Sequence, residues 1–97
     1  MWAMTYYKPG TVTTGFDTCI EEIAINDSNT EASITVTKDT DDTSYLIVCL
    51  DSRYDYGVTI NGESVNFIKR FDGETEIPLA GKHEKSQVIV KTLTNLN

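Results

Sequence analysis

The sequence is poor in the side chains from which most catalytic and metal sites are built. It has one histidine, His83, and two cysteines, Cys19 and Cys49, among 97 residues. A Cys–His nucleophile needs a thiol close to an imidazole, and Cys49 lies in an apolar run, where a thiol is inert. No Cys/His cluster has the spacing of a zinc site. The sequence therefore predicts a protein without cofactor, metal or enzymatic activity; an enzyme with a Cys/His or carboxylate site is the alternative.

Motifs of phosphate binding, hydrolysis and calcium binding are also missing. The chain has no Gly-rich phosphate loop, no Gly-x-Ser-x-Gly and no His-Glu-x-x-His. Asp39, Asp41 and Asp42 could offer oxygen ligands to calcium. An EF-hand loop counted from the first of these would have Ser44 where glycine is required and Leu50 where glutamate is required. We interpret this acidic run as a solvated hairpin turn.

Basic residues and long apolar runs are scarce as well. Eight Lys and Arg residues stand against fifteen Asp and Glu residues, which gives a net charge of −7. Nucleic acids and anionic membrane surfaces both attract cationic proteins, so neither is expected as a partner. No run approaches the roughly 18 apolar residues of a membrane-spanning helix, and residues 1–4 do not begin a signal peptide. The two cysteines are too few for a disulfide scaffold; they could form one bridge or serve as small core side chains.

Two glycine-containing turns organise residues 55–77. Asn61-Gly62 and Asp72-Gly73 are dipeptides that two-residue hairpin turns favour, since both central positions need a positive φ. The first turn predicts that Ile60 faces Glu63, Val58 faces Val65 and Tyr56 faces Phe67. The second turn predicts that Phe71 faces Glu74, Lys69 faces Glu76 and Ile68 faces Ile77. The two hairpins would share the strand 63–71 and form a three-stranded meander with one apolar face.

Alternation of apolar and polar residues marks the other strands. Ala32, Ile34 and Val36 alternate with polar residues, which is typical of a half-buried strand. The run 45–50 is apolar at every position, so we expect a central strand covered on both faces. Residues 18–25 carry a capping-box pattern but are few for a helix, and we interpret them as a strand with a bulge. The remaining predicted strands are Trp2–Tyr7, Thr11–Phe16 and Gln87–Leu93, the last with Val88 and Val90 inward.

These segments make about eight short strands separated by turns, and no helical segment is long enough for a βαβ unit. A chain of 97 residues is the usual size of one domain. We therefore predict that residues 1–97 form a single all-β domain, a small antiparallel β-sandwich of immunoglobulin-like or jelly-roll type.

The loop that follows the apolar run 45–50 is the best candidate for a recognition site. It consists of Asp51, Ser52, Arg53, Tyr54 and Asp55. Tyrosine gives a large contact area at low entropic cost, and arginine is a frequent hot-spot residue in interfaces. The register of the predicted hairpin turns Tyr56 into the core and leaves Tyr54 exposed. The alternative is a plain connection between two strands with an ordinary surface tyrosine.

The second half of the chain carries an ordered set of motifs. A hydrophobic strand, 45–50, leads to Tyr54-Asp55-Tyr56-Gly57, then to a strand that ends in Asn61-Gly62, and later to the segment Ile77-Pro78-Leu79-Ala80-Gly81-Lys82-His83. In these motifs residues 45–91 resemble the C-terminal β-domain of YfhO-type bacterial membrane proteins, in which Trp usually follows the first glycine, where this chain has Val58. The resemblance implies a non-catalytic extracytoplasmic module beside a cell-envelope glycosyltransferase. It carries over no catalytic residues.

We therefore expect a non-catalytic interaction or structural module that acts through loops or a strand edge. Its partner would be a protein or a carbohydrate. One setting is an accessory domain of a bacterial envelope protein, which the resemblance favours. The other is a small phage virion or decoration protein that forms homo-oligomers, which Met1 and a complete-looking set of strands favour.

Overall fold

The protein is built from two antiparallel β-sheets. The computed structural model describes residues 9–15, 17–70 and 73–93. These residues contain nine strands and no α-helix: β1 (Thr11–Thr13), β2 (Thr18–Ile25), β3 (Glu31–Lys38), β4 (Ser44–Cys49), β5 (Tyr56–Ile60), β6 (Glu63–Ser64), β7 (Ile68–Lys69), β8 (Glu74–Leu79) and β9 (His83–Thr92). One sheet has the strand order β1-β4-β8-β7, and the other has the order β2-β3-β9-β5-β6.

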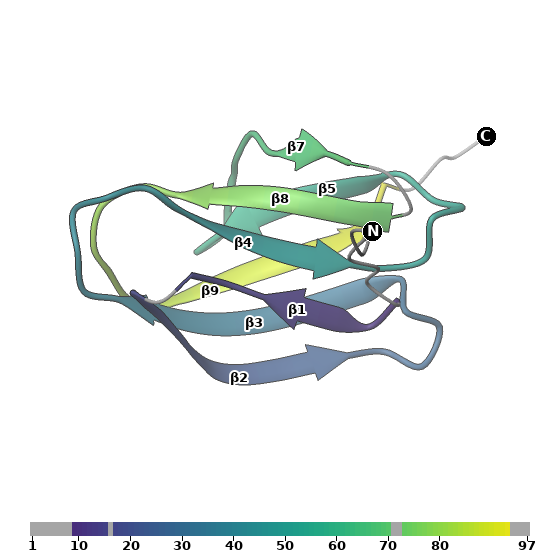
Figure 1. Cartoon of the computed structure of the whole chain (residues 1–97). Coiled ribbons are helices and arrows are strands. Elements are labelled where there is room, and N and C mark those ends of the chain that lie inside the picture. Colours follow the sequence, from purple (N-terminus) through teal and green to yellow (C-terminus); the bar gives the residue numbers. More distant parts are fainter. Residues whose placement is uncertain (1–8, 16, 71–72, 94–97) are drawn as a thin grey trace, which may run out of the picture.

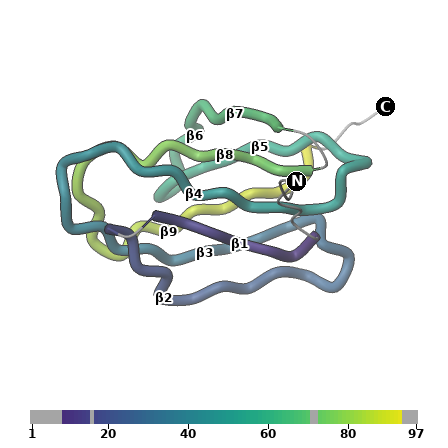
Figure 2. The backbone as a smooth tube through the Cα atoms, viewed as in Figure 1, coloured from purple at the N-terminus to yellow at the C-terminus, as the bar shows by residue number. Residues whose placement is uncertain are grey.

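The two sheets pack face to face around one apolar core, as the two layers in Figure 1 and the backbone trace in Figure 2 show. The five-stranded sheet contributes Ile34, Val36, Val88 and Val90 to the core, and the four-stranded sheet contributes Leu46, Val48, Ile77 and Leu79; none of these side chains is exposed. The predicted small antiparallel β-sandwich is therefore confirmed.

Strands β3 and β4 form where they were predicted, whereas β9 begins at His83, four residues before the predicted strand Gln87–Leu93. Ala32, Val88 and Val90 are buried as expected. Strand β4 lies inside its sheet, between β1 and β8. Its expected cover on both faces is wrong at one end, because Tyr45 is 43% exposed. The outward side chain of Tyr45 therefore meets solvent, whereas Cys49 at the other end of the strand is completely buried.

Residues 18–25 form the predicted strand with a bulge. The register of β2 against β3 shifts between Ile20 and Glu22. A regular strand would turn Ile20 and Ile23 to opposite faces, because their spacing is odd. The extra residue of a bulge corrects this spacing, since two residues of β2 then oppose one of β3. Both isoleucines can therefore face the core side of the sheet, and no helix forms.

The Asn61-Gly62 hairpin forms as predicted. Both residues have positive φ, 52° and 87°, as a two-residue turn of this kind requires. Ile60 pairs with Glu63, and the amide of Val65 donates a hydrogen bond to the carbonyl of Val58 at 3.1 Å. The predicted turn and the pairing next to it are thus confirmed.

The second half of the meander is wrong. After β6 the chain leaves the five-stranded sheet, and β7 joins β8 in the other sheet. The ladder between β5 and β6 ends after Thr59–Ser64, so the pair predicted between Tyr56 and Phe67 does not form. The physical reason is that β5 and β8 belong to opposite layers, so no single strand can pair with both. The crossing segment instead packs Val65 and Phe67 against the core.

The pairing of β7 with β8 also differs from the prediction by one residue. Ile68 faces Glu76, and Lys69 faces Thr75. Arg70 follows this register, because its amide donates to the carbonyl of Glu74 at 2.8 Å. The connection between the strands is therefore one residue longer than a two-residue turn. The predicted pair Phe71–Glu74 and the predicted strand Trp2–Tyr7 lie outside the described residues, as does Phe16.

Two glycines allow a sharp test of this backbone. Gly73 (φ 81°) lies against β4: its amide carbonyl accepts from Leu50 at 3.1 Å, and a Cβ built on it would lie 2.0 Å from the Leu50 carbonyl oxygen. Gly62 has a similar φ of 87° but open space around its Cβ position. We expect Gly62→Ala to cost about 1 kcal/mol of backbone strain. Gly73→Ala should cost about 3 kcal/mol, because the clash adds an overpacking penalty.

Chemical denaturation of both variants measures these free energies of unfolding. Equal losses for Gly62→Ala and Gly73→Ala would show that Gly73 is not pressed against Leu50.

Candidate functional site

The predicted recognition loop, Asp51–Asp55, connects β4 to β5 and is held by its own hydrogen bonds. The Asp51 carboxylate accepts from Arg53 Nε at 3.0 Å, from Arg53 Nη2 at 2.7 Å and from the Arg53 amide at 3.0 Å. These bonds lower the pKa of Asp51 to about 2. The amide of Asp51 donates to the Asn29 carbonyl at 2.8 Å, which joins the loop to the β2–β3 turn. Asp51 therefore holds both the loop backbone and the Arg53 side chain in place.

The two tyrosines of this segment have opposite environments. Tyr54 is 45% exposed, and the Arg53 guanidinium carbon lies 5.8 Å from the centre of its ring. Tyr56 is buried, and its hydroxyl donates to the Asp51 carbonyl at 2.6 Å. Burial raises the pKa of Tyr56 to about 12. The predicted exposure of Tyr54 and burial of Tyr56 are both confirmed.

A small hollow of about 80 Å³ lies beside the loop, and Ser52, Tyr54, Tyr56, Phe67, Lys69 and Arg70 are among its lining residues. Lys69 pairs with Asp55 at 2.5 Å, and Arg70 pairs with Glu76 at 3.2 Å. Each cation near the loop thus has an acidic partner. The surface of the loop thus offers aromatic and guanidinium groups with little net charge.

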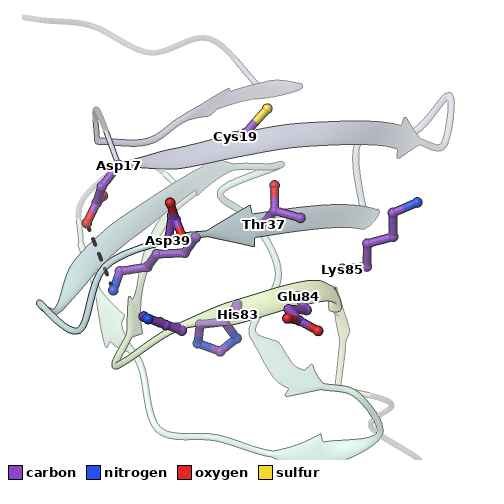
Figure 3. Close-up of a pocket in the computed structure, with 9 residues that line it drawn as sticks. Asp17, Cys19, Thr37, Asp39, His83, Glu84 and Lys85 are labelled. Carbon is purple, nitrogen blue, oxygen red and sulfur yellow. Dashed lines mark ion pairs between the residues drawn. The ribbon is translucent and has the colours of Figure 1, made fainter.

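A larger open hollow of about 590 Å³ lies at the other end of β3 (Figure 3). Its lining includes Asp17, Cys19, Thr37, His83 and Lys85. Sequence reasoning did not identify this hollow, because its residues come from three separate strands and the loops beside them.

Lys38 is fully buried at the edge of this hollow. Its ammonium donates to the Thr40 carbonyl at 2.8 Å, to the Gly81 carbonyl at 2.7 Å and to the Asp42 carbonyl, and it lies 3.9 Å from the Asp17 carboxylate. Lys38 occupies the next inward position of β3 after Val36, so strand alternation turns it toward the core. Lys38 thus joins the β3–β4 and β8–β9 loops. In the sequence, its burial could have been predicted by continuing the alternation of Ala32, Ile34 and Val36 one step further.

Asp17 completes the same network. Its carboxylate accepts from Ser44 Oγ at 2.5 Å, from Thr40 Oγ1 at 2.6 Å and from Thr18 Oγ1 at 3.2 Å. The bonds from Ser44 and Thr40 are the main reason that the pKa of Asp17 falls to about 2. Because the Lys38 ammonium and the Asp17 carboxylate both have hydrogen-bond partners within the protein, we interpret the pair as a structural cross-link.

His83 is the first residue of β9. Its Nδ1 lies 2.9 Å from Ser86 Oγ, whereas Nε2 is buried and has no hydrogen-bond partner. Cys19 lines the same hollow and is exposed. Within the described residues, the recorded polar contact of the His83 ring is to Ser86, with none to a thiol or a carboxylate.

The two cysteines do not bridge. Cys19 is exposed on β2, whereas Cys49 is buried on β4 in the opposite sheet. Cys49 is thus a core side chain, and Cys19 is not.

In the part of the chain that the structure describes, no group of three His, Cys, Asp or Glu side chains could hold a metal ion. The same residues include no helix that is long and apolar enough to cross a membrane.

Comparisons with family models, with curated proteins and with solved structures find no match to this chain.

Lys38 should be among the most important polar residues for stability. We expect Lys38→Met to lower the free energy of unfolding by about 3 kcal/mol, because three carbonyl oxygens and the Asp17 carboxylate lose their shared donor. Lys82→Met is the matched control: Lys82 lines the same hollow but is exposed, and its loss should change stability by less than about 0.5 kcal/mol. Urea denaturation measures both, and equal stabilities of the two variants would contradict the cross-link.

The acid sensitivity of the fold should depend on Asp17. Its pKa is about 2 in the folded chain, below the ordinary value of 3.8 for an aspartate. A depressed folded pKa gives stability that is complete above the unfolded pKa and is lost as the pH falls from about 4 toward 2. Asp17→Asn should therefore reduce the loss of stability over this range, measured by denaturation at several pH values. Asp27→Asn, in the exposed β2–β3 turn, is the control; an unchanged acid profile in Asp17→Asn would refute the network.

Proposed function

We propose that this protein is a non-catalytic binding module that contacts its partner with the loop Asp51–Asp55. The observation that supports this most is the exposed pair of Arg53 and Tyr54: Asp51 holds the Arg53 guanidinium in place before any partner is present, and this group lies 5.8 Å from the centre of the Tyr54 ring. Arginine and tyrosine are the residue types most often found at binding hot spots.

The fixed geometry of the loop favours binding energetically. Ordering a free side chain in an interface costs about 0.5–1.5 kcal/mol. Arg53 is already held by a two-pronged contact with Asp51, and the loop backbone is tied to the buried Tyr56 hydroxyl. Part of this cost is therefore met by folding, and the Tyr54 ring remains 45% exposed for stacking or packing.

The setting we propose is an accessory domain of a bacterial envelope protein. The support is the resemblance of residues 45–91 to the C-terminal β-domain of YfhO-type proteins, whose motifs fall on β4, on the loop, on the β5–β6 hairpin and on the β8–β9 connection. A small phage virion or decoration protein is the second setting. It differs in that the chain would assemble with copies of itself, which size-exclusion chromatography would detect.

The loop can be tested against a matched tyrosine elsewhere on the molecule. Tyr45 is 43% exposed on β4, close to the 45% of Tyr54. Immobilised wild type, Tyr54→Ala and Tyr45→Ala would be used to capture proteins and glycans from envelope extracts. A specific partner should be kept by Tyr45→Ala and lost by Tyr54→Ala, with an affinity at least about fivefold weaker because a hot-spot side chain contributes more than about 1 kcal/mol.

Arg53→Ala should weaken the same partner, and circular dichroism would show that each variant is folded. A partner that is lost with Tyr45→Ala and kept with Tyr54→Ala would refute the proposed site.

A further inference from the structure

Strand β2 is the long open edge of the five-stranded sheet. It pairs with β3 on one side, and Figures 1 and 2 show it as the outermost strand of its layer. It has eight residues, whereas the other edge strands, β1, β6 and β7, have three, two and two. An open edge presents unpaired backbone donors and acceptors to a further strand. Among the described strands, β2 therefore offers the longest template for backbone pairing.

The core side of this edge is incompletely covered. Ile23 pairs with Ile34 across the β2–β3 ladder, so both side chains lie on the core face of the sheet. Ile34 is completely buried, but Ile23 is 48% exposed. Its neighbours Ile20 and Ile25 are partly buried against the core. A strand added beside β2 would bring a side chain next to Ile23 and remove that apolar surface from water.

The bulge gives the outer side of the edge a double negative charge. Glu22 pairs with the outward Thr35, and Glu21 accepts a hydrogen bond from the outward Thr37 at 3.1 Å. Two successive carboxylates therefore lie on the outer face, which a regular strand would not allow. Within the described residues, neither glutamate is part of a recorded ion pair. This charge is available to a cationic partner.

A second copy of the chain fits this edge poorly. Two identical edge strands that meet about a twofold axis run antiparallel, and their longest overlap is centred on the middle of each strand. In β2 the middle is Glu21 and Glu22, so the four carboxylates would meet one another. Like charges in directly opposed positions destabilise a strand pair, and each chain also carries a net charge of −7. The edge charge thus disfavours self-pairing and favours a basic segment.

We propose that β2 binds an extended basic segment of another protein, which adds to the five-stranded sheet as a sixth strand. Backbone hydrogen bonds along β2 supply affinity, as in other cases of strand addition. Alternation sets the sequence that fits: Lys or Arg on the outer face beside Glu21 and Glu22, and apolar residues on the core face beside Ile23. This site is separate from the loop Asp51–Asp55, so either proposal can fail without the other.

The test is a titration of the full isotope-labelled chain with a blocked peptide of alternating lysine and valine, followed by NMR. We expect saturable chemical-shift changes and slower hydrogen exchange at the β2 amides that point away from β3. The affinity should fall as salt is added. Glu22→Gln should weaken binding about two- to fivefold, the range for one exposed ion pair. Glu63→Gln removes the same charge from the opposite edge strand, β6, and should leave the affinity unchanged.

Backbone pairing is separated from simple charge attraction by a second peptide. The same lysine–valine sequence, N-methylated at every residue, keeps its charges but has no amide donors, so it cannot pair as a strand. It should therefore not slow the hydrogen exchange of the β2 amides. Equal binding of both peptides, equal effects of Glu22→Gln and Glu63→Gln, or the absence of saturable shifts in β2 would each overturn the proposal. So would protection, in the free chain, of the β2 amides that point away from β3, because another part of the chain or a second copy would then fill the edge.

Discussion

The structure depends on one constraint, the packing of two apolar sheet faces against each other. Strand alternation turns Ile34 and Val88 from one layer toward Leu46 and Ile77 from the other, and these side chains are completely buried. Burial of each such side chain contributes about 1.5–3 kcal/mol. This face-to-face core fixes which strands share a sheet. It thereby decides the path of every loop between them.

The polar features at the two ends follow from that core. At one end, the hydroxyl of the buried Tyr56 donates a hydrogen bond to the Asp51 carbonyl and so holds the connection from β4 to β5 against the core. At the other end, the same alternation that buries Val36 carries Lys38 inward, where loop carbonyls surround its ammonium. One end therefore displays an exposed arginine and tyrosine, whereas the other holds a buried cross-link at the edge of the open hollow. This difference is why we propose the loop, and not the opposite end, as the binding surface.

Sequence reasoning succeeded where local chemistry decides the outcome. The Asn61-Gly62 turn, the alternation of residues 32–36 and the bulged strand 18–25 all follow from short-range preferences. It failed for β7, because the sheet that a two-residue strand joins is set by packing of Val65 and Phe67 and not by the turn sequence. Gly73 was recognised as a turn residue, but its close approach to Leu50 is a contact between distant segments. Lys38 was missed for a related reason: its partners lie in loops whose position depends on the whole fold.

The assignment of β5 and β8 to opposite layers is the central claim, and cross-strand contacts test it most directly. A nuclear Overhauser spectrum of the labelled chain should show close backbone protons between Val58 and Val90 and between Val48 and Thr75, the pairs of the two separate sheets. Contacts of Lys69 with Glu76 together with Tyr56 with Phe67 would instead describe one continuous three-stranded ribbon. That result would contradict the sandwich topology on which the loop and the open edge of β2 both depend.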